Sequence, residues 1–316
     1  MRLVFCGTPR FAVPTLEALL SAGHEIALVV TQPDRPVGRT QQLAAPPVKQ
    51  IALGAGLAVT QPEKIRNNAE FRAQLEALAP DAIVVVAYGR IIPPWMLALP
   101  RLGCVNLHAS LLPKYRGAAP IQWAVAMGEM ATGNTTMLLE EGLDTGPILL
   151  QQQVPISPDQ TAADLFDVLA QAGAPLVVET LAGLAGGTIQ PQLQDHAQAT
   201  LAPLLDREDG RMNFAERTAA ELKNRWRGFQ PWPGAFTALD GKKVLIHQME
   251  VVASSGLPTQ HSAAPGELRV ENRHLLVACA QNTWLELVEL QLEGKKRLPA
   301  AEFLRGTQFA AGARLG

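Results

Sequence analysis

The sequence predicts an α/β protein in two parts. A Rossmann-like parallel sheet is expected over residues 1–188 and, after a linker over residues 189–206, a smaller OB-like β-barrel over residues 207–316. One observation behind this fold class is the alternation of strand-like and helix-like segments in the first part, which is typical of a parallel sheet. The other is a change after Phe214 to short strands separated by turns, the pattern of a small barrel.

In the first part, short apolar runs predict strands and longer stretches with helical periodicity predict helices. The expected strands cover residues 2–6, 25–31, 57–60, 81–87, 104–107, 135–139 and 148–156. The expected helices cover residues 11–22, 46–55, 69–78, 118–127 and 161–184. A break or kink is expected at residues 173–175, because proline disrupts a helix interior. The Pro- and Gly-rich stretch 32–43 is expected to be a long loop, of the kind that is usually functional or disordered.

The second part is expected to begin with a helix over residues 216–227. Short strands and a terminal helix follow, at residues 236–239, 243–253, 275–279, 284–290 and 300–305. Residues 207–316 carry 15 Lys and Arg against 12 Asp and Glu, whereas residues 1–206 carry 12 against 17. A modestly basic β domain could lie against phosphates, although ordinary scatter of surface charge accounts for these numbers as well.

Composition places the chain among ordinary globular proteins, with 47% hydrophobic and 18% charged residues. No apolar run reaches the roughly 18 residues of a membrane span, and the apolar N-terminal segment is too short for a signal peptide. The three cysteines lie far apart, which indicates a reducing cytoplasm without disulfides. Histidines are scattered without ligand spacing, so no metal is expected. Gly7 stands alone where a dinucleotide fingerprint needs three glycines, which argues against NAD.

The stretch 103–123 carries the first pair of candidate catalytic residues. Asn106 and His108 alternate with apolar residues of a short strand, so both side chains emerge on one face near its C-terminal end. Ligands bind at that end of strands in an open parallel sheet. An amide can donate an N–H to a developing oxyanion, and an imidazole can move a proton near neutral pH. The alternative is a structural pair in which the two side chains satisfy each other.

A third candidate, Asp144, lies between Gly142 and Gly146 after a strand-like run. Glycines let the backbone turn sharply and allow a ligand to come close. A carboxylate that reaches His108 would fix the tautomer of the imidazole and raise its basicity. The alternative is an ordinary turn aspartate, a residue type that turns favour.

The motifs N-L-H-A-S-L-L-P-K-Y-R-G-A-A-P and G-L-D-T-G closely resemble those of the formyltransferases that use 10-formyltetrahydrofolate. The resemblance places the family's catalytic residues on Asn106, His108 and Asp144 and implies no metal. It also implies that a loop and a turn hold the folate co-substrate. The residues concerned are Ser110, Leu111, Leu112 and Pro113 of the loop, and Tyr88, Gly89 and Ile91 of the turn.

Among these relatives, the methionyl-tRNA formyltransferases are the most similar. T-Q-P-D-R-P-V-G-R at residues 31–39 resembles their acceptor-stem loop and places its tRNA-contacting arginine on Arg39. R-G-F-Q-P-W-P-G-A at residues 227–235 resembles the start of their C-terminal domain. The chain departs from the family at residues 40–42, where Thr-Gln-Gln replaces the usual Gly-Lys-Lys and removes two positive charges.

The resemblance implies transfer of a formyl group to the α-amine of methionine on initiator methionyl-tRNA. It implies a cytoplasmic enzyme of translation initiation, with no membrane and no obligatory protein partner. Two alternatives remain open. A nucleotide-sugar formyltransferase would share the same three catalytic residues, and comparing the two acceptors would separate it. A non-enzymatic nucleotide- or RNA-binding module would use the Asn/His pair structurally, and a folate-dependent single-turnover assay would separate it.

Overall fold

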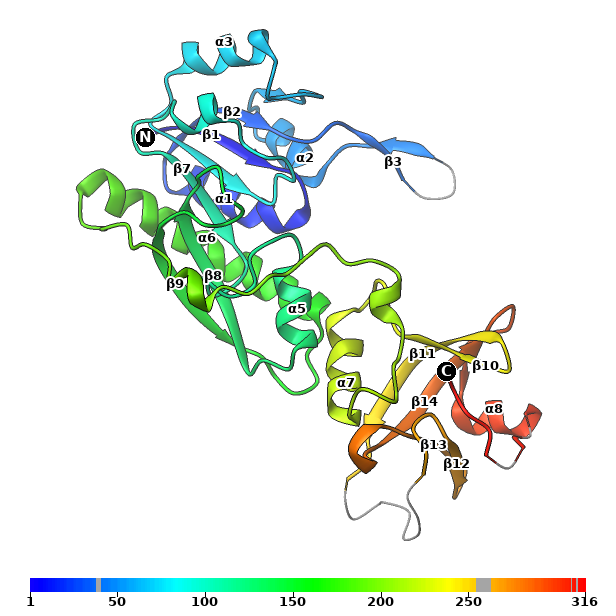
Figure 1. Cartoon of the computed structure of the whole chain (residues 1–316). Coiled ribbons are helices and arrows are strands. Elements are labelled where there is room, and N and C mark those ends of the chain that lie inside the picture. Colours follow the sequence, from blue (N-terminus) through cyan, green and yellow to red (C-terminus); the bar gives the residue numbers. More distant parts are fainter. Residues whose placement is uncertain (38–40, 254–262, 308, 311) are drawn as a thin grey trace. The chain divides into compact units, whose positions relative to one another are not determined.

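The computed structural model describes residues 1–37, 41–253, 263–307, 309–310 and 312–316. The chain forms two compact units. Unit 1 comprises Met1–Ile121, Ala131–Ile156 and Asp164–Pro203, and unit 2 comprises Gln122–Met130, Ser157–Ala163 and Leu204–Gly316. Together they have the expected fold class, a Rossmann-like sheet unit and an antiparallel, OB-like β unit (Figure 1).

Within the described residues, a seven-stranded sheet of order β5-β2-β1-β6-β7-β8-β9 forms the centre of unit 1. Its strands are β1 Arg2–Gly7, β2 Glu25–Val30, β5 Val59–Thr60, β6 Ala82–Val86, β7 Cys104–His108, β8 Ala131–Leu138 and β9 Ile148–Pro155. The five strands from β5 to β7 are parallel, whereas β8 and β9 are antiparallel, which the sequence pattern did not predict. The chain runs outward from β1 to β2 and β5 and then crosses to β6. The carboxyl ends of β1 and β6 therefore meet at a topological switch point, where such sheets bind ligands.

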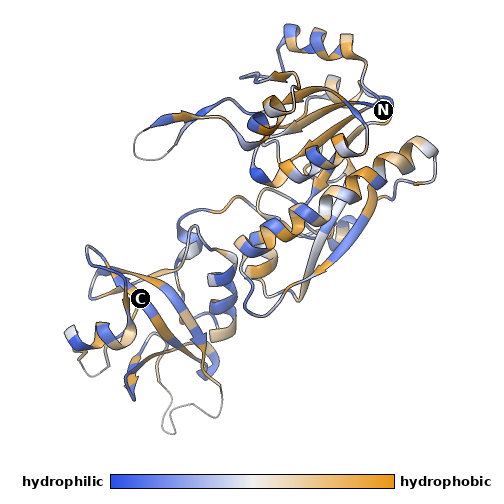
Figure 2. Cartoon of the chain, turned by 180° about the vertical axis from the view of Figure 1, so that it is seen from behind, coloured by the Kyte–Doolittle hydropathy of each residue, from blue (hydrophilic) through white to orange (hydrophobic). Residues whose placement is uncertain are grey.

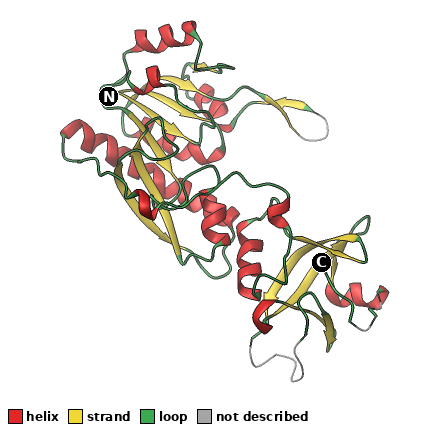
Figure 3. Ribbon diagram, in the orientation of Figure 1, coloured by secondary structure: helices red, strands yellow, loops and turns green. Residues whose placement is uncertain are grey.

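Helices cover both faces of this sheet (Figure 3). They are α1 Val13–Ser21, α2 Pro47–Gly54, α3 Ala69–Leu78, α4 Pro94–Leu97 and α6 Ala162–Gly186, while α5 Pro120–Ala126 lies mainly in unit 2. Phe71 of α3 and Met96 of α4 share a buried cluster with Val4, Ile83 and Cys104 of the strands. Hydrophobic residues accordingly concentrate along the strands (Figure 2).

Helix α6 continues through Pro175, so the expectation of a break or kink there is wrong as regards a break. A proline in a helix interior costs about 3 kcal/mol, and a fully buried leucine or valine contributes about 1.5–3 kcal/mol. Burial therefore outweighs the proline, because four such side chains are 0% exposed: Leu165, Leu169, Val177 and Leu181. The helix is long and apolar enough to cross a membrane, yet its close contact with Leu107 of β7 at Gly173 is that of a core helix.

The stretch 32–43, expected to be a loop, contains a hairpin. β3 Arg35–Val37 pairs antiparallel with β4 Gln42–Ala44 and projects from the sheet (Figure 1). Residues 38–40, which connect the two strands, lie outside the described residues.

Polar contacts fix the base of this hairpin. Lys49 Nζ donates to both carboxylate oxygens of Asp34, at 2.9 and 2.8 Å, and this hydrogen bonding lowers the pKa of Asp34. Gln32 Nε2 donates to the Tyr88 carbonyl at 3.1 Å. The hairpin base is thereby tied to the turn that follows β6.

Gly133 of β8 offers a test of how tightly the sheet is packed. A Cβ atom there would lie 2.1 Å from the backbone carbonyl oxygen of Gln152 and 2.6 Å from Leu111 Cδ2. The carbonyl belongs to the paired strand β9 and cannot move freely. We expect Gly133→Ala to lower the free energy of unfolding by about 3 kcal/mol, measured by urea titration. Gly54→Ala is the control, because a Cβ in that helix meets nothing within 4 Å and alanine favours helix by up to about 1 kcal/mol. Equal losses at both positions would contradict the packing argument.

Unit 2 is built on an antiparallel sheet of order β10-β11-β14-β13-β12, with β15 beside β14. Its elements are α7 Ala219–Gly228, β10 Phe236–Leu239, β11 Lys242–Val251, β12 Leu268–Glu271, β13 His274–Ala278, β14 Trp284–Leu292, β15 Leu298–Pro299 and α8 Ala300–Gly306. Thr218 and Glu221 form a capping box that starts α7. The sheet curls around a buried cluster that includes Leu285 and Leu287. Strands β12 and β15 were not expected, because both are short and only partly apolar.

The last residues of the chain bridge the two edges of this curled sheet. Leu315 pairs with Leu239 of β10, and Arg314 pairs with Glu267 beside β12. The C-terminal segment thus supplies backbone partners to both edges of an otherwise open sheet.

Candidate active site

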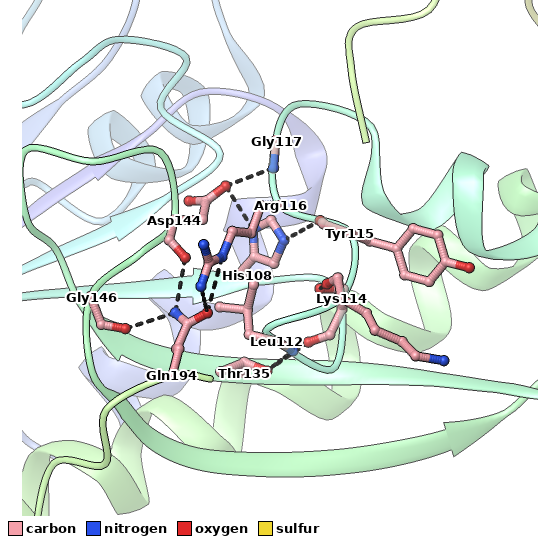
Figure 4. A network of polar contacts seen from close by, with 11 residues as sticks. His108, Leu112, Lys114, Tyr115, Arg116, Gly117, Thr135, Asp144, Gly146 and Gln194 are labelled. Atoms are coloured by element: carbon pink, nitrogen blue, oxygen red, sulfur yellow. Dashed lines mark hydrogen bonds and ion pairs between the residues drawn. The ribbon is translucent and has the colours of Figure 1, made fainter. Parts of the chain in front are cut away.

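Asn106 and His108 lie near the carboxyl end of β7, and Figure 4 shows the Asp144 carboxylate facing the His108 ring. Asn106 and His108 lie on the same face of that strand and are 9% and 6% exposed. Asp144 lies in the connection between β8 and β9, and its Oδ2 is 3.7 Å from His108 Nδ1. The structure therefore brings together residues from two segments more than thirty positions apart in the chain.

The orientation of His108 is set by a backbone carbonyl. Its Nε2 lies 2.9 Å from the carbonyl oxygen of Tyr115. A carbonyl oxygen can only accept, so Nε2 carries a hydrogen and donates it. In the neutral imidazole, Nδ1 is then the unprotonated, basic nitrogen, and it faces Asp144. The Tyr115 carbonyl thus fixes the tautomer of His108. From the sequence, Asp144 had been expected to do so.

The Asp144 carboxylate is held in place by a second segment. Its Oδ2 accepts a hydrogen bond from the backbone N–H of Gly117 at 2.8 Å. Asp144 has a φ of 51°, in the left-handed region that aspartate and asparagine tolerate better than most residues. A carboxylate anchored this way, with its side chain 14% exposed, differs from a solvated turn aspartate and can stabilise a proton taken up by His108.

The Asn106 side chain is not paired with His108. Within the described residues, its amide makes no hydrogen bond, while the His108 ring bonds to Tyr115. The alternative in which these two side chains satisfy each other therefore does not hold. The Asn106 amide is available to donate to a ligand oxygen, as an oxyanion site requires.

The loop at 110–113 forms a fixed edge beside His108. Ser110 Oγ donates to the Lys114 carbonyl at 2.7 Å, and Thr135 Oγ1 donates to the Ser110 carbonyl at 2.6 Å. The Leu112 N–H donates in turn to Thr135 Oγ1 at 3.2 Å, and the Leu112–Pro113 peptide is cis. Ser110 and Leu112 are buried, whereas Leu111 and Pro113 are half-buried. Of the four predicted folate contacts in this loop, Leu111 and Pro113 present the accessible surfaces.

The turn after β6 also contains both buried and exposed residues among its predicted folate contacts. The Tyr88 ring is 2% exposed and belongs to the core cluster under the sheet. Burial raises the pKa of Tyr88 above its usual range, so the phenol stays neutral. Gly89 has a φ of 77°, and the Ile91 side chain is 88% exposed. A ligand at this turn would meet Ile91 and the backbone of residues 88–89, not the Tyr88 ring.

Sequence reasoning missed two side chains that support Asp144. Gln194 Nε2 donates to the carbonyls of Asp144 and Gly146, at 2.9 and 2.7 Å. Arg116 donates to Gln194 Oε1 through Nε at 3.1 Å and Nη2 at 2.6 Å. Gln194 lies in the stretch expected to be a linker, and its partners are some fifty to eighty residues away, so no local pattern could have indicated it.

Two further expectations concern the tRNA-binding arginine and a metal site. Arg39, the predicted tRNA-binding residue, lies outside the described residues. In the part of the chain that the structure describes, no group of three or more His, Cys, Asp or Glu side chains could hold a metal ion.

Comparison with known proteins decides the family. The chain matches the family described as formyl transferase over residues 1–181 and the formyl transferase C-terminal domain over residues 204–308. The methionyl-tRNA formyltransferase of Acidobacterium capsulatum is 67% identical, with 100% of both chains covered. That of Koribacter versatilis is 60% identical, with 100% of this chain and 99% of the relative covered. The chain belongs to the methionyl-tRNA formyltransferase family.

Solved structures agree with this family at the level of the fold. The sugar 3N-formyl transferase WlaRD, determined in the presence of dTDP and 5-N-formyl-THF, matches with a TM-score of 0.64. The match covers 94% of this chain and 99% of that chain, at 16% sequence identity. The two-unit architecture is therefore shared by formyltransferases whose sequences have diverged widely.

Proposed function

We propose that the chain transfers the formyl group of 10-formyltetrahydrofolate to the α-amine of methionine on initiator methionyl-tRNA. The product is N-formylmethionyl-tRNA, the substrate of translation initiation in the cytoplasm. The observation that carries this proposal is the arrangement of His108 Nδ1, Asp144 and the Asn106 amide, which makes no hydrogen bond to any residue that the structure describes. It occurs in a chain that matches methionyl-tRNA formyltransferases along its whole length.

The geometry supports direct attack by the amine. The methionine nitrogen forms a bond to the formyl carbon, whose oxygen becomes an oxyanion that the Asn106 N–H stabilises. The proton released by the attacking amine passes to His108 Nδ1, beside the Asp144 carboxylate. The bond between the formyl carbon and the folate nitrogen then breaks, and that nitrogen takes up the proton. No covalent bond to the protein is needed, because the acceptor amine is itself the nucleophile.

The two substrates are proposed to contact different parts of the chain. The folate is proposed to lie against the 110–113 loop and the turn at 88–91, next to His108. The tRNA is proposed to contact the connection between β3 and β4, which includes Arg39, and the C-terminal residues 207–316. That C-terminal part holds 15 Lys and Arg against 12 Asp and Glu, and this positive balance supports contact with phosphates.

The deciding experiment supplies labelled formyl donor together with charged initiator tRNA. Label is expected on the methionine amine, with multiple turnovers. An amino-sugar nucleotide is offered in a parallel reaction. Transfer to the sugar nucleotide without transfer to the tRNA would overturn the acceptor assignment, and the absence of transfer to either would overturn the enzyme assignment.

Arg39→Ala is expected to raise the KM for charged tRNA or lower kcat on it, while transfer to a small amine stays unchanged. A guanidinium can bridge phosphates or stack on an unpaired base, and in the sequence Arg39 falls between β3 and β4, far from Asn106, His108 and Asp144. Losing one phosphate contact should flatten the dependence of log affinity on log salt by about one unit at most. Initial rates at several salt concentrations measure both effects.

The matched control for this change is Arg66→Ala, which removes an exposed arginine elsewhere in unit 1. It should leave the kinetics on tRNA unaltered. Equal kcat/KM on tRNA for Arg39→Ala and the unmodified protein would reject the contact. A loss shared by tRNA and the small amine would show instead that Arg39 supports the fold.

A further inference from the structure

We propose that Gln194 is a positioning residue for formyl transfer, and that it acts by holding the Asp144 turn so that the carboxylate faces His108. This inference rests on the proposed function. Gln194 is 6% exposed, and its Nε2 donates at once to the carbonyls of Asp144 and Gly146 (Figure 4). These are the two carbonyls on either side of Thr145, so one amide fixes two peptide planes of the turn.

The turn needs such support because its own backbone is strained and little covered. Asp144 has a φ of 51°, in the left-handed region that costs most non-glycine residues about 1–2 kcal/mol and aspartate less. The residues before it, Glu140 to Leu143, are all exposed. With the Asp144 carbonyl bound by Gln194 and its carboxylate bound by the Gly117 N–H, the residue is held at two points. Losing either contact lets the carboxylate rotate away from His108.

Arg116 determines which way the Gln194 amide points. The guanidinium, in a residue 7% exposed, places two N–H groups on Gln194 Oε1. A guanidinium can only donate, so the amide oxygen must face Arg116 and the NH₂ group must face the turn. The Arg116 backbone is itself held, because its N–H donates to the Thr200 carbonyl and its carbonyl accepts from the Ala202 N–H, at 2.8 and 2.7 Å. The two segments are thus joined independently of Gln194.

The chemical consequence falls on turnover rather than on substrate binding. The proton from the attacking amine is held where His108 Nδ1 and Asp144 Oδ2 face each other at 3.7 Å. A misplacement of about 1 Å in such an arrangement can cost about 10²-fold in rate. Within the described residues, the hydrogen bonds of Gln194 go to Arg116 and to the carbonyls of the 144–146 turn, and none goes to the 110–113 loop or to the turn at 88–91. Its loss should therefore leave the KM for the formyl donor little changed.

The test is Gln194→Glu, which keeps the shape and keeps an oxygen for Arg116. It replaces the NH₂ donor with an oxygen that meets two carbonyl oxygens. We expect kcat to fall about 10–100-fold for transfer to tRNA and to hydroxylamine alike, with little change in the KM for the donor. If Gln194 served only to anchor Arg116, the glutamate would form an ion pair and preserve both activity and melting temperature. That result would overturn the proposal.

A double-mutant cycle with Asp144→Asn shows whether Gln194 acts through Asp144. In the Asp144→Asn background, Gln194→Glu should add less than about a threefold loss, because coupled residues are not additive. Full multiplication of the two losses would overturn the positioning role. If Gln194→Glu does not fold, as judged by circular dichroism, the neutral isostere Gln194→Met goes through the same cycle. Hydroxylamine as acceptor keeps the test independent of tRNA, so a wrong acceptor assignment would appear only in the tRNA reactions.

Discussion

Replacing His108 with glutamine is expected to reduce the turnover of formyl transfer by roughly 10²–10⁴-fold, the usual contribution of a positioned proton-transfer group. The glutamine amide can still donate an N–H to the Tyr115 carbonyl, which His108 Nε2 contacts at 2.9 Å. No atom of the new side chain can take the place of the basic Nδ1. The protein should therefore remain folded and bind the formyl donor while losing catalysis.

Glutamine is the informative substitution because His108 is only 6% exposed. Alanine at that position would also leave a cavity and remove the hydrogen bond to the Tyr115 carbonyl, which would mix a stability loss with the catalytic one. The measurements are single-turnover transfer to methionyl-tRNA and the urea midpoint of unfolding. His274→Gln, at an exposed histidine of unit 2, serves as the control. Turnover of His108→Gln within a few-fold of the unmodified protein would remove His108 from the mechanism.

Asp144→Asn is expected to lower turnover by roughly 10²-fold or more without loss of folding. The amide oxygen of asparagine can still accept from the Gly117 N–H, and asparagine tolerates the left-handed φ of 51° at this position. What disappears is the negative charge that faces His108 Nδ1 and stabilises the proton held there. Glu141→Gln removes an exposed carboxylate three residues earlier and should have no comparable effect.

Two measurements separate the possible outcomes for Asp144→Asn. Equilibrium binding of the formyl donor is expected to persist, since the Asp144 carboxylate is proposed to stabilise the proton on His108 and not to contact the folate. ¹⁵N NMR of the His108 ring is expected to show the Nε2–H tautomer still in place, because the Tyr115 carbonyl sets it. A switch of tautomer in the mutant would mean that Asp144 orients the ring after all.

Short-range patterns in the sequence were sufficient for some parts of the site. The alternation N-L-H in β7 placed Asn106 and His108 on one face because side chains alternate along any strand. The expected parallel strands placed that face at a ligand-binding edge. Both inferences depend on residues that are adjacent in the chain, where backbone geometry leaves few alternatives.

The remaining contacts depend on pairings between distant segments, which local pattern does not encode. Nothing near Gln194 indicates that it reaches Asp144, fifty residues earlier. Thr135 was expected to lie in a strand. Its hydroxyl hydrogen-bonds to the 110–113 loop because β7 and β8 pair antiparallel, and the sequence pattern did not predict that pairing. Pro175 shows the converse, since a local rule predicted a break and tertiary burial of α6 overrode it.

The pairing of Leu315 with Leu239 and of Arg314 with Glu267 has a consequence for how unit 2 behaves in solution. Without residues 313–316, the Leu268 N–H and the carbonyls of Gly266 and Ala238 would lose their backbone partners at the two edges of the curled sheet. Open edges of this kind act as templates for strands of neighbouring molecules. The final residues therefore cover part of each edge, at positions where unpaired backbone groups would otherwise be open to strands of neighbouring molecules.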